Sequence, residues 1–331
     1  MSQEEYHAIK TEGLTKQYSS ETAVDDLSLS ITPGEIYGFL GPNGAGKSTT
    51  INLLMDFTRP TSGTINILGE DPRNDVVSVH QRVGVLPDDF SLYESRTGRE
   101  HLRLFIDTKG ANDEPEDLLE RVGLEDSIDD KAGDYSRGMS QRLALAMALV
   151  GEPDVLILDE PFSGLDPHGV RKVRKVVHEE NDRGATVFFS SHVLGQVKLV
   201  CDQIGILNEG CLVAEGTLEE LQASASINTE LKLTVDGDPK RAAQAIDTLE
   251  GVIDVSAPED QIDEQTESER QNHVNKTVTA QIISDEYRRD VIDTIEEVGI
   301  SVEDTRIKDP SIESIFVAHT SEAPAEVNSN D

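Results

Sequence analysis

The nine residues GPNGAGKST, at positions 41–49, constrain this chain more than any other stretch of its sequence. They follow the apolar run IYGFL (36–40) and precede TTINLLMDF, whose apolar pattern predicts a helix. Gly41, Gly44 and Gly46 let backbone N–H groups turn toward phosphate oxygens, and the start of the helix adds a favourable dipole. In this strand–loop–helix context Lys47 is expected to neutralise phosphate charge and Ser48 to ligate Mg²⁺. The structural alternative is a glycine-rich turn before a helix.

Two later strands end in side chains suited to phosphate chemistry. VLILD (155–159) is followed by Glu160, and TVFFSS (186–191) is followed by His192. Ligands collect at the carboxyl edge of a parallel sheet, so Asp159 can hold Mg²⁺ through water and Glu160 can polarise a water that attacks the γ-phosphate. His192 at the same edge is expected to sense that phosphate, although a packing or capping histidine is the plainer alternative.

The segment YSRGMSQR (135–142) stands between an acid-rich loop and the apolar run LALAMALV. Its serine and glycine suit a helix cap, and they also suit one half of a binding site whose other half lies elsewhere. In SGLDPHG (163–169), Asp166 is open to the same two interpretations, a helix start or a functional loop.

The apolar pattern predicts an α/β domain followed by a smaller one. IYGFL, VGVLP (83–87), VLILD, TVFFSS and IGILN (204–208) read as buried strands of a parallel sheet, and HAIKTEGL, LSLSI and GTINIL add short β segments. The stretch from about 88 to 150 reads as a mainly helical insertion. After about residue 225 the order β-α-β-β-α-β predicts a ferredoxin-like unit, with a solvated loop over 258–272 and a disordered tail from Ser321.

Composition excludes some classes of function. The 331 residues contain 64 Asp and Glu against 29 Lys and Arg, a formal net charge of -35, which repels nucleic-acid phosphates. Such an acidic surface is typical of proteins from very salty cytoplasm, with an ordinary acidic protein as the alternative. No apolar run approaches the roughly 20 residues that span a bilayer, so any role at a membrane is expected to come through a partner.

Taken together, the P-loop, YSRGMSQR, LILDEPFSGLDP and SSH resemble the nucleotide-binding domain of ATP-binding cassette (ABC) proteins. The resemblance covers about residues 5–222 and implies a P-loop NTPase fold with a RecA-like core sheet, an antiparallel β subdomain and a helical subdomain over about 88–150. The ferredoxin-like domain is placed at 228–320 and the tail at 321–331. The layout is similar to ABC-2-type drug- and sodium-export ATPases, to whose C-terminal ending PSIESIF (310–316) is also similar.

The resemblance also implies roles for individual residues. Tyr18 matches the aromatic that stacks on adenine, with Val24 nearby, and Asp166 matches a loop that communicates between subunits. His192 matches the switch histidine. The family's signature is usually Leu-Ser-Gly-Gly-Gln, in which Ser136 and Gly138 remain while Tyr135, Arg137 and Met139 depart. Asp88 stands where the family usually has a glutamine that reaches Mg²⁺ and the attacking water. The residues expected to bind ATP are Tyr18, Val24, Gly41, Pro42, Asn43, Gly44, Ala45, Gly46, Lys47, Ser48, Thr49, Ser136, Gly138, Met139 and Asp166. Those expected to act in catalysis or hold Mg²⁺ are Lys47, Ser48, Asp88, Asp159, Glu160 and His192.

In this family two domains sandwich two ATP molecules, each between one P-loop and the partner's signature. With one of each motif, the chain is predicted to form a homodimer or to pair with a related ATPase subunit. The predicted function is the Mg²⁺-dependent ATPase subunit of an ABC-2-type exporter, held at the inner face of the cell membrane by a separate permease. The alternatives are a soluble ABC ATPase of translation or DNA repair, and a non-catalytic ATP-sensing scaffold.

Overall fold

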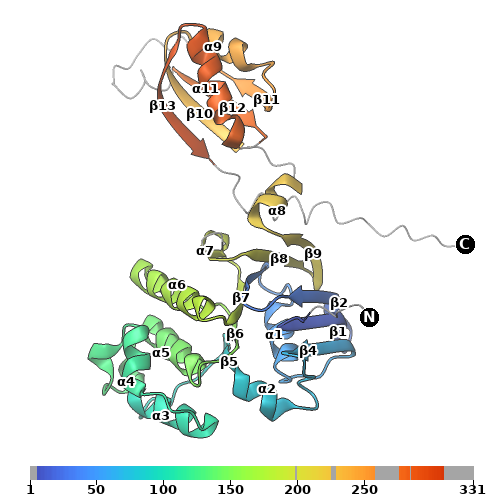
Figure 1. Cartoon of the computed structure of the whole chain (residues 1–331), viewed down its shortest axis with the longest axis vertical. Helices are drawn as coiled ribbons and strands as arrows, with labels where there is room; N and C mark the ends of the chain where they lie inside the picture. Colours follow the sequence, from blue (N-terminus) through green and yellow to red (C-terminus); the bar gives the residue numbers. More distant parts are fainter. Residues whose placement is uncertain (1–5, 198–199, 225–228, 258–275, 284, 309–331) are drawn as a thin grey trace, which may run out of the picture. The chain divides into compact units, whose positions relative to one another are not determined.

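The computed structural model describes residues 6–197, 200–224, 229–257, 276–283 and 285–308. The chain divides into two compact units, Met1–Leu218 and Glu219–Asp331 (Figure 1). The domain boundary predicted from the sequence, between 222 and 228, stands a few residues further along. The predicted loop at 258–272, the segment PSIESIF and the tail from 321 lie outside the described residues.

The core of the first unit is a six-stranded sheet in the order β5-β6-β7-β3-β8-β9. All five apolar runs predicted as buried strands are in it, and they pair in parallel, which confirms the predicted α/β sheet. The edge strand β9 pairs antiparallel with β8. The strands are β3 (Ile36–Leu40), β5 (Val83–Leu86), β6 (Val155–Leu158), β7 (Thr186–Ser191), β8 (Gln203–Asn208) and β9 (Cys211–Gly216).

A second, antiparallel sheet of order β2-β1-β4 forms the predicted β subdomain. Its strands are β1 (Ile9–Tyr18), β2 (Glu21–Ile31) and β4 (Ser62–Ile67). Figure 1 shows this sheet and α1 on one side of the central sheet, with α5 and α6 on the other. The helices that accompany the two sheets are α1 (Lys47–Leu54), α2 (Val76–Arg82), α6 (Pro167–Asp182) and α7 (Leu194–Val197). Helix α8 (Leu218–Ser224) begins at the boundary between the units.

The predicted helical insertion contains α3 (Gly98–Lys109), α4 (Pro115–Arg121), two 3₁₀ turns (Glu125–Ser127 and Ala132–Asp134) and α5 (Arg137–Leu149). Helix α3 begins at a capping box, in which the Thr97 side chain accepts from the Glu100 N–H and the Glu100 carboxylate accepts from the Thr97 N–H.

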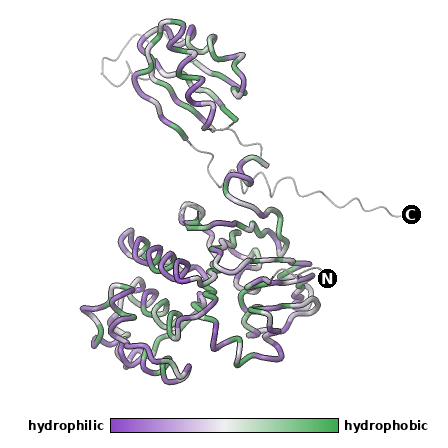
Figure 2. The backbone as a smooth tube through the Cα atoms, viewed as in Figure 1, coloured by the Kyte–Doolittle hydropathy of each residue, from purple (hydrophilic) through white to green (hydrophobic). Residues whose placement is uncertain are grey.

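The far end of α5 packs directly on strand β5. A Cβ atom on Gly84 of that strand would lie 2.0 Å from the carbonyl oxygen of Ala148, so only glycine allows this approach. Figure 2 shows apolar residues along the sheet strands, whereas α6 is mostly hydrophilic along its length.

The second unit has the predicted β-α-β-β-α-β order. Its sheet runs β11-β12-β10-β13 and is antiparallel throughout, as a ferredoxin-like unit requires. A separate apolar core lies beneath it, built from residues such as Leu231, Leu233, Val278 and Ile295. The elements are β10 (Thr229–Asp236), α9 (Pro239–Ile246), β11 (Val252–Ser256), β12 (Thr277–Ile282), a 3₁₀ turn (Asp285–Tyr287), α11 (Arg288–Glu297) and β13 (Ser301–Lys308).

Across the described parts of both units, none of the helices combines the length and the apolar character that crossing a bilayer demands.

Candidate active site

The loop from Gly41 to Gly46 connects β3 to α1 and has the backbone shape of a phosphate cradle. Gly44 and Gly46 adopt φ of 85° and 106°, where side chains are strained. A Cβ on Gly46 would also lie 2.3 Å from the carbonyl oxygen of Ala23. Because Gly46 is the N-cap of α1 and no side chain caps this helix, the first-turn N–H groups face the loop and are able to bind an anion.

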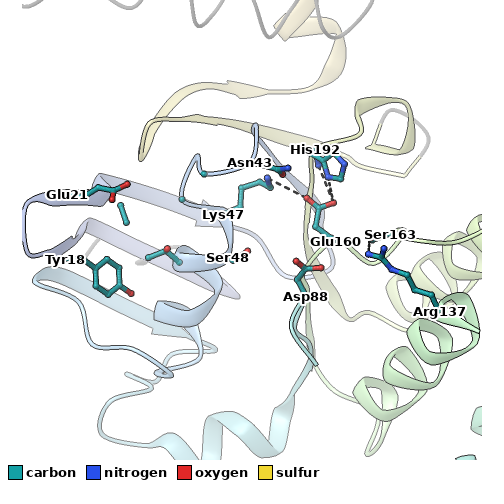
Figure 3. Close-up of a pocket in the computed structure, with 14 residues that line it drawn as sticks. Tyr18, Glu21, Asn43, Lys47, Ser48, Asp88, Arg137, Glu160, Ser163 and His192 are labelled. Carbon is teal, nitrogen blue, oxygen red and sulfur yellow. Dashed lines mark hydrogen bonds and ion pairs between the residues drawn. The ribbon is translucent and has the colours of Figure 1, made fainter. Parts of the chain in front are cut away.

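The Lys47 side chain curls back into this loop. Its ammonium donates to the carbonyl oxygens of Gly41 at 2.8 Å and Pro42 at 3.1 Å, and it is only 6% exposed. The Glu160 carboxylate lies 3.6 Å away (Figure 3). The structure therefore holds a nearly buried cation where the cradle N–H groups converge, which is the arrangement that phosphate oxygens need.

Glu160 follows β6 in a constrained backbone conformation. Its φ is 48°, in the left-handed region that few non-glycine residues adopt. Its N–H donates to Ser190 Oγ at 3.0 Å, and the Ser190 hydroxyl donates to the Asp159 carboxylate in a very short hydrogen bond. Ser190 of β7 thus fixes both of the acidic residues that follow β6. Asp159 is buried, and Glu160 reaches into the site.

His192 lies where the sequence predicts it, at the end of β7. Its Nδ1 is 2.9 Å from Glu160 Oε2, and its backbone N–H donates to the same oxygen at 3.4 Å. The pair joins a group able to take a proton from water to a group able to contact the γ-phosphate. Figure 3 shows Asp88, two residues beyond β5, beside them on the Glu160 side of the site.

These groups surround a cleft of about 490 Å³. Of the residues predicted to bind nucleotide, metal or water, those that line it are Tyr18, Asn43, Gly44, Gly46, Lys47, Ser48, Thr49, Asp88, Glu160 and His192. Tyr18 is 48% exposed at one end, as a stacking platform must be, with the Lys16 ammonium 4.7 Å from its ring centroid. Gly41, Ala45 and Asp159 are buried behind this surface, and Pro42 is exposed beside it.

Val24, expected near the adenine-stacking aromatic, does not itself line the cleft. It is fully buried in the hydrophobic core, and its neighbours Glu21 and Ala23 line the cleft. Strand β2 is irregular here: Asp26 adopts φ of 49°, and the pairing with β1 shifts register between Lys16 and Leu14. A role for Val24 beside adenine stays a prediction.

Of the signature residues, Ser136, Gly138 and Met139 lie outside this cleft, at the start of α5, whereas Arg137 of the same turn lines it. Ser136 is the helix N-cap, and its Oγ accepts from the Met139 N–H at 3.2 Å, so the capping interpretation is correct. Gly138 packs near Gly164 and Leu165, its Cβ position 3.4 Å from the Gly164 carbonyl oxygen.

Tyr135, in place of the usual leucine, anchors this segment through a 2.6 Å hydrogen bond from its hydroxyl to the Ser127 carbonyl oxygen. Burial, with Asp130 nearby, raises the pKa of this phenol. Asp166 is likewise a cap, accepting from the Gly169 N–H at 2.7 Å at the start of α6. Its role between subunits stays a prediction.

The structure adds Ser190 and Ser163 to the residues predicted for the site, and it places Arg137, for which the sequence left an extra phosphate contact and an interface spacer as alternatives. Arg137 and Ser163 line the cleft, and an Arg137 Nη donates to Ser163 Oγ at 3.0 Å. Ser190 could have been predicted, because it lies two residues before His192 at the end of the same strand. The contact of Arg137 with Ser163 joins residues 26 apart and has no local sequence signal.

The donor set fits a magnesium nucleotide. The described residues contain no cluster of three or more His, Cys, Asp or Glu able to hold a metal by themselves. Mg²⁺ commonly takes one or two carboxylates, a hydroxyl and phosphate oxygens, and Ser48, Asp88 and Asp159 surround the cradle in a way that supplies the protein's share.

Comparison with known proteins agrees with this geometry. The family model described as "ABC transporter" matches residues 24–163. The bacitracin transport ATP-binding protein BcrA of Enterococcus faecalis is 37% identical over 73% of this chain and 79% of its own length. The daunorubicin resistance ATP-binding protein DrrA3 of Streptomyces coeruleorubidus is 32% identical over 94% of this chain and 95% of its own length. The Nod factor export ATP-binding protein I of Burkholderia lata is 39% identical over 61% of this chain and 68% of its own length.

Solved structures show the same fold. The ATP-binding subunit of an ABC transporter superposes with a TM-score of 0.61 at 30% identity, over 66% of this chain and 92% of that one. A dimeric ATP-binding cassette bound to ADP and Pi superposes with a TM-score of 0.59 at 25% identity, over 63% of this chain and 98% of that one. The chain belongs to the ABC transporter family, as one of its ATP-binding and ATP-hydrolysing subunits.

Proposed function

We propose that this chain powers export through a separate membrane permease, as the ATPase subunit of an ABC-2-type exporter at the inner face of the cell membrane. The names of its relatives support this, since they describe bacitracin transport, daunorubicin resistance and Nod factor export. The match to DrrA3 includes the second unit as well as the first. The transported substrate is left to the permease, which forms the path across the membrane.

One observation carries the proposal: the site in a single chain is half of an ATP site. The P-loop, Glu160 and His192 converge on one cleft, whereas Ser136, Gly138 and Met139 at the start of α5 do not line it. A second copy, or a paired ATPase subunit, supplies the missing half by placing its α5 start against the γ-phosphate. ATP then favours the closed dimer because it contacts both chains only when they are closed.

Each residue of the site has its own role in ATP binding or hydrolysis. Tyr18 stacks on adenine, the N–H groups of residues 44–49 and Lys47 bind the β- and γ-phosphates, and Ser48, Asp88 and Asp159 hold Mg²⁺. The metal, when bound, neutralises charge on the phosphate oxygens. Glu160 accepts the proton of the attacking water, and His192 orients Glu160 and contacts the γ-phosphate. Phosphate oxygens compete with Glu160 for Lys47, which lies 3.6 Å from Glu160.

A second cleft, of about 400 Å³, adjoins the first and suits a helix of the permease. Its walls include the apolar Phe90 and Leu92 and the acidic Asp88 and Glu94, and all of its lining residues lie between positions 88 and 141, in the helical subdomain. Its lining residues are Asp88, Phe90, Ser91, Leu92, Glu94, Ala132, Gly133, Arg137, Ser140 and Gln141. Because Asp88 and Arg137 line both clefts, a change at the permease reaches the nucleotide through shared side chains.

The test uses the full chain. Glu160→Gln should lower kcat for ATP at least about 100-fold, as expected for the loss of a general base, and should accumulate a stable dimer in ATP by size-exclusion chromatography with light scattering. Lys47→Ala, the matched control, should neither bind ATP nor form that dimer. Unchanged turnover in Glu160→Gln would show that the assigned base is wrong.

Two further measurements separate the halves of the site and the alternatives. Ser136→Arg should abolish turnover while leaving ATP binding by the single chain largely intact; an equal loss of both would refute a trans-acting signature. Co-purification with a polytopic membrane protein in detergent supports the exporter, whereas stable association with ribosomes would favour a soluble ATPase.

A further inference from the structure

Arg137 occupies an unfavourable position for a cation. It is the first residue of α5, directly after the cap Ser136, where the helix dipole and the free N–H groups already present positive charge. Local rules are broken most often at functional sites, so the compensating interaction of this guanidinium is informative.

The compensation is found within the same chain. The Arg137 guanidinium turns away from the helix start and donates to Ser163 Oγ at 3.0 Å (Figure 3). Its stem covers Gly164, where φ is 71° and a Cβ would lie 2.7 Å from both Cδ and Nε of Arg137. Any side chain at 164 would expel the arginine, so the glycine and the arginine form one packed contact.

A second contact, one turn along α5, holds the other end of the same loop. The Gln141 amide donates to the Glu160 carbonyl oxygen at 3.2 Å, and Gln141 is only 5% exposed. The Ser163 N–H closes the loop by donating to that same Glu160 carbonyl at 2.9 Å. Residues 137 and 141 lie on one face of the helix, so α5 grips the loop 160–164 at both ends.

We propose that Arg137 is a positioning residue that, with Gln141, ties the signature helix to the chain's own loop 160–166, which carries the general base and Asp166. The inference rests on the proposed function. The first turn of α5 contacts the partner's ATP, and the side chains of the same turn fix the backbone of Glu160. Closure on one ATP therefore sets the geometry of the base at the other.

The alternative role for Arg137 is a direct contact with the partner's phosphate. That role requires the guanidinium to point out from the helix start, whereas one of its N–H groups donates to Ser163 and its stem packs on Gly164. A direct contact strengthens ATP binding, while a positioning contact acts on the chemical step. The two roles therefore separate in KM and kcat.

The experiment is a double-mutant cycle on ATP hydrolysis by the full chain, with Arg137→Ala, Ser163→Ala and the double variant. Arg137→Ala and Ser163→Ala should each lower kcat by about 5- to 10-fold with KM for ATP unchanged within about 2-fold, and the double variant should lose no more than the worse single variant. Arg137→Lys should recover part of the loss. The control variant Arg171→Ala, which removes an exposed arginine of α6, should have the kcat and KM of the wild type.

Three results would overturn the inference: a raised KM with normal kcat in Arg137→Ala, losses that multiply in the double variant, or no effect of Ser163→Ala. A wild type that does not hydrolyse ATP, or a Glu160→Gln variant that traps no dimer, instead refutes the proposed function. Thermal unfolding midpoints within about 2 °C of the wild type confirm that each variant is folded, because an exposed side chain alters stability little.

Discussion

Ser190 offers the sharpest test of how the site is built. Its hydroxyl donates to the Asp159 carboxylate and accepts from the Glu160 N–H, and all three groups lie at the ends of β6 and β7. Ser190 itself is completely buried. The substitution Ser190→Ala removes both hydrogen bonds while leaving the shape of the core almost unchanged.

The size of the effect follows from the two bonds. Loss of a hydrogen bond to a charged group costs about 1.5–3 kcal/mol, and an unsatisfied buried N–H costs about 1–3 kcal/mol. Because the remaining carboxylate is only 3% exposed, water restores little of this. We expect the free energy of unfolding of the first unit to fall by about 3 kcal/mol, and kcat to fall about 10-fold because Glu160 loses the anchor of its left-handed backbone.

Urea unfolding followed by circular dichroism, beside steady-state ATP hydrolysis, measures both quantities. The matched control is Ser191→Ala, the next residue of β7, equally buried but bonded only to the backbone N–H and carbonyl oxygen of Val193. This control should lose about 1–2 kcal/mol, because its two hydrogen bonds are neutral and Val193 is 40% exposed so that water can replace them, and it should keep most of its activity. Equal losses in the two variants would refute the argument that Ser190 acts through the two acidic residues.

Three other predictions concern binding, pH and salt. Gly46→Ala should abolish ATP binding, measured by calorimetry, because its Cβ would lie 2.3 Å from the Ala23 carbonyl oxygen and φ is 106°. Gly34→Ala, where φ is also positive at 75° but a Cβ meets no atom within 4 Å, should bind ATP normally. Burial, with Glu215 accepting its hydrogen bond at 2.7 Å, raises the pKa of Tyr37 well above 10. The folded protein holds the Tyr37 phenol in its neutral form, so the stability that this raised pKa contributes is complete below pH 10 and is lost at higher pH. Absorbance titration should show that one of the six tyrosines ionises only when the protein unfolds, and Tyr37→Phe should remove this late ionisation. A net charge of -35 should make the unfolding midpoint rise between 0.1 and 2 M KCl (about 10 to under 3 Å Debye length), and an unchanged midpoint would contradict the salt-adapted interpretation.

The parts of the fold that depend on local pattern could be predicted from the sequence. Apolar runs such as IYGFL and VLILD form the buried parallel strands, and GPNGAGKST forms the loop between β3 and α1, because each is determined by its own composition. The caps at Ser136 and Asp166 were also within reach, since a short polar side chain before a helix satisfies its first N–H groups.

Contacts that depend on non-local packing could not be predicted. The left-handed backbone of Asp26 in β2 and the complete burial of Val24 depend on how this strand packs against β1 and the core. The contacts of Ser190 with Asp159 and of Arg137 with Ser163 join segments about 30 residues apart, brought together only when β6, β7 and α5 pack. No periodicity in the chain encodes which polar atoms will meet there.

The close contact of Gly84 with Ala148 fixes one end of α5 against strand β5, so a tilt of this helix moves mainly its other end. Its thirteen residues extend about 20 Å at 1.5 Å per residue, and the end that touches β5 acts as the pivot. A tilt of about 3° at the pivot displaces the opposite end, which carries Ser136 and Arg137, by about 1 Å, enough to break a hydrogen bond. The close approach that Gly84 allows therefore determines how far a small tilt of α5 moves the residues at the start of this helix.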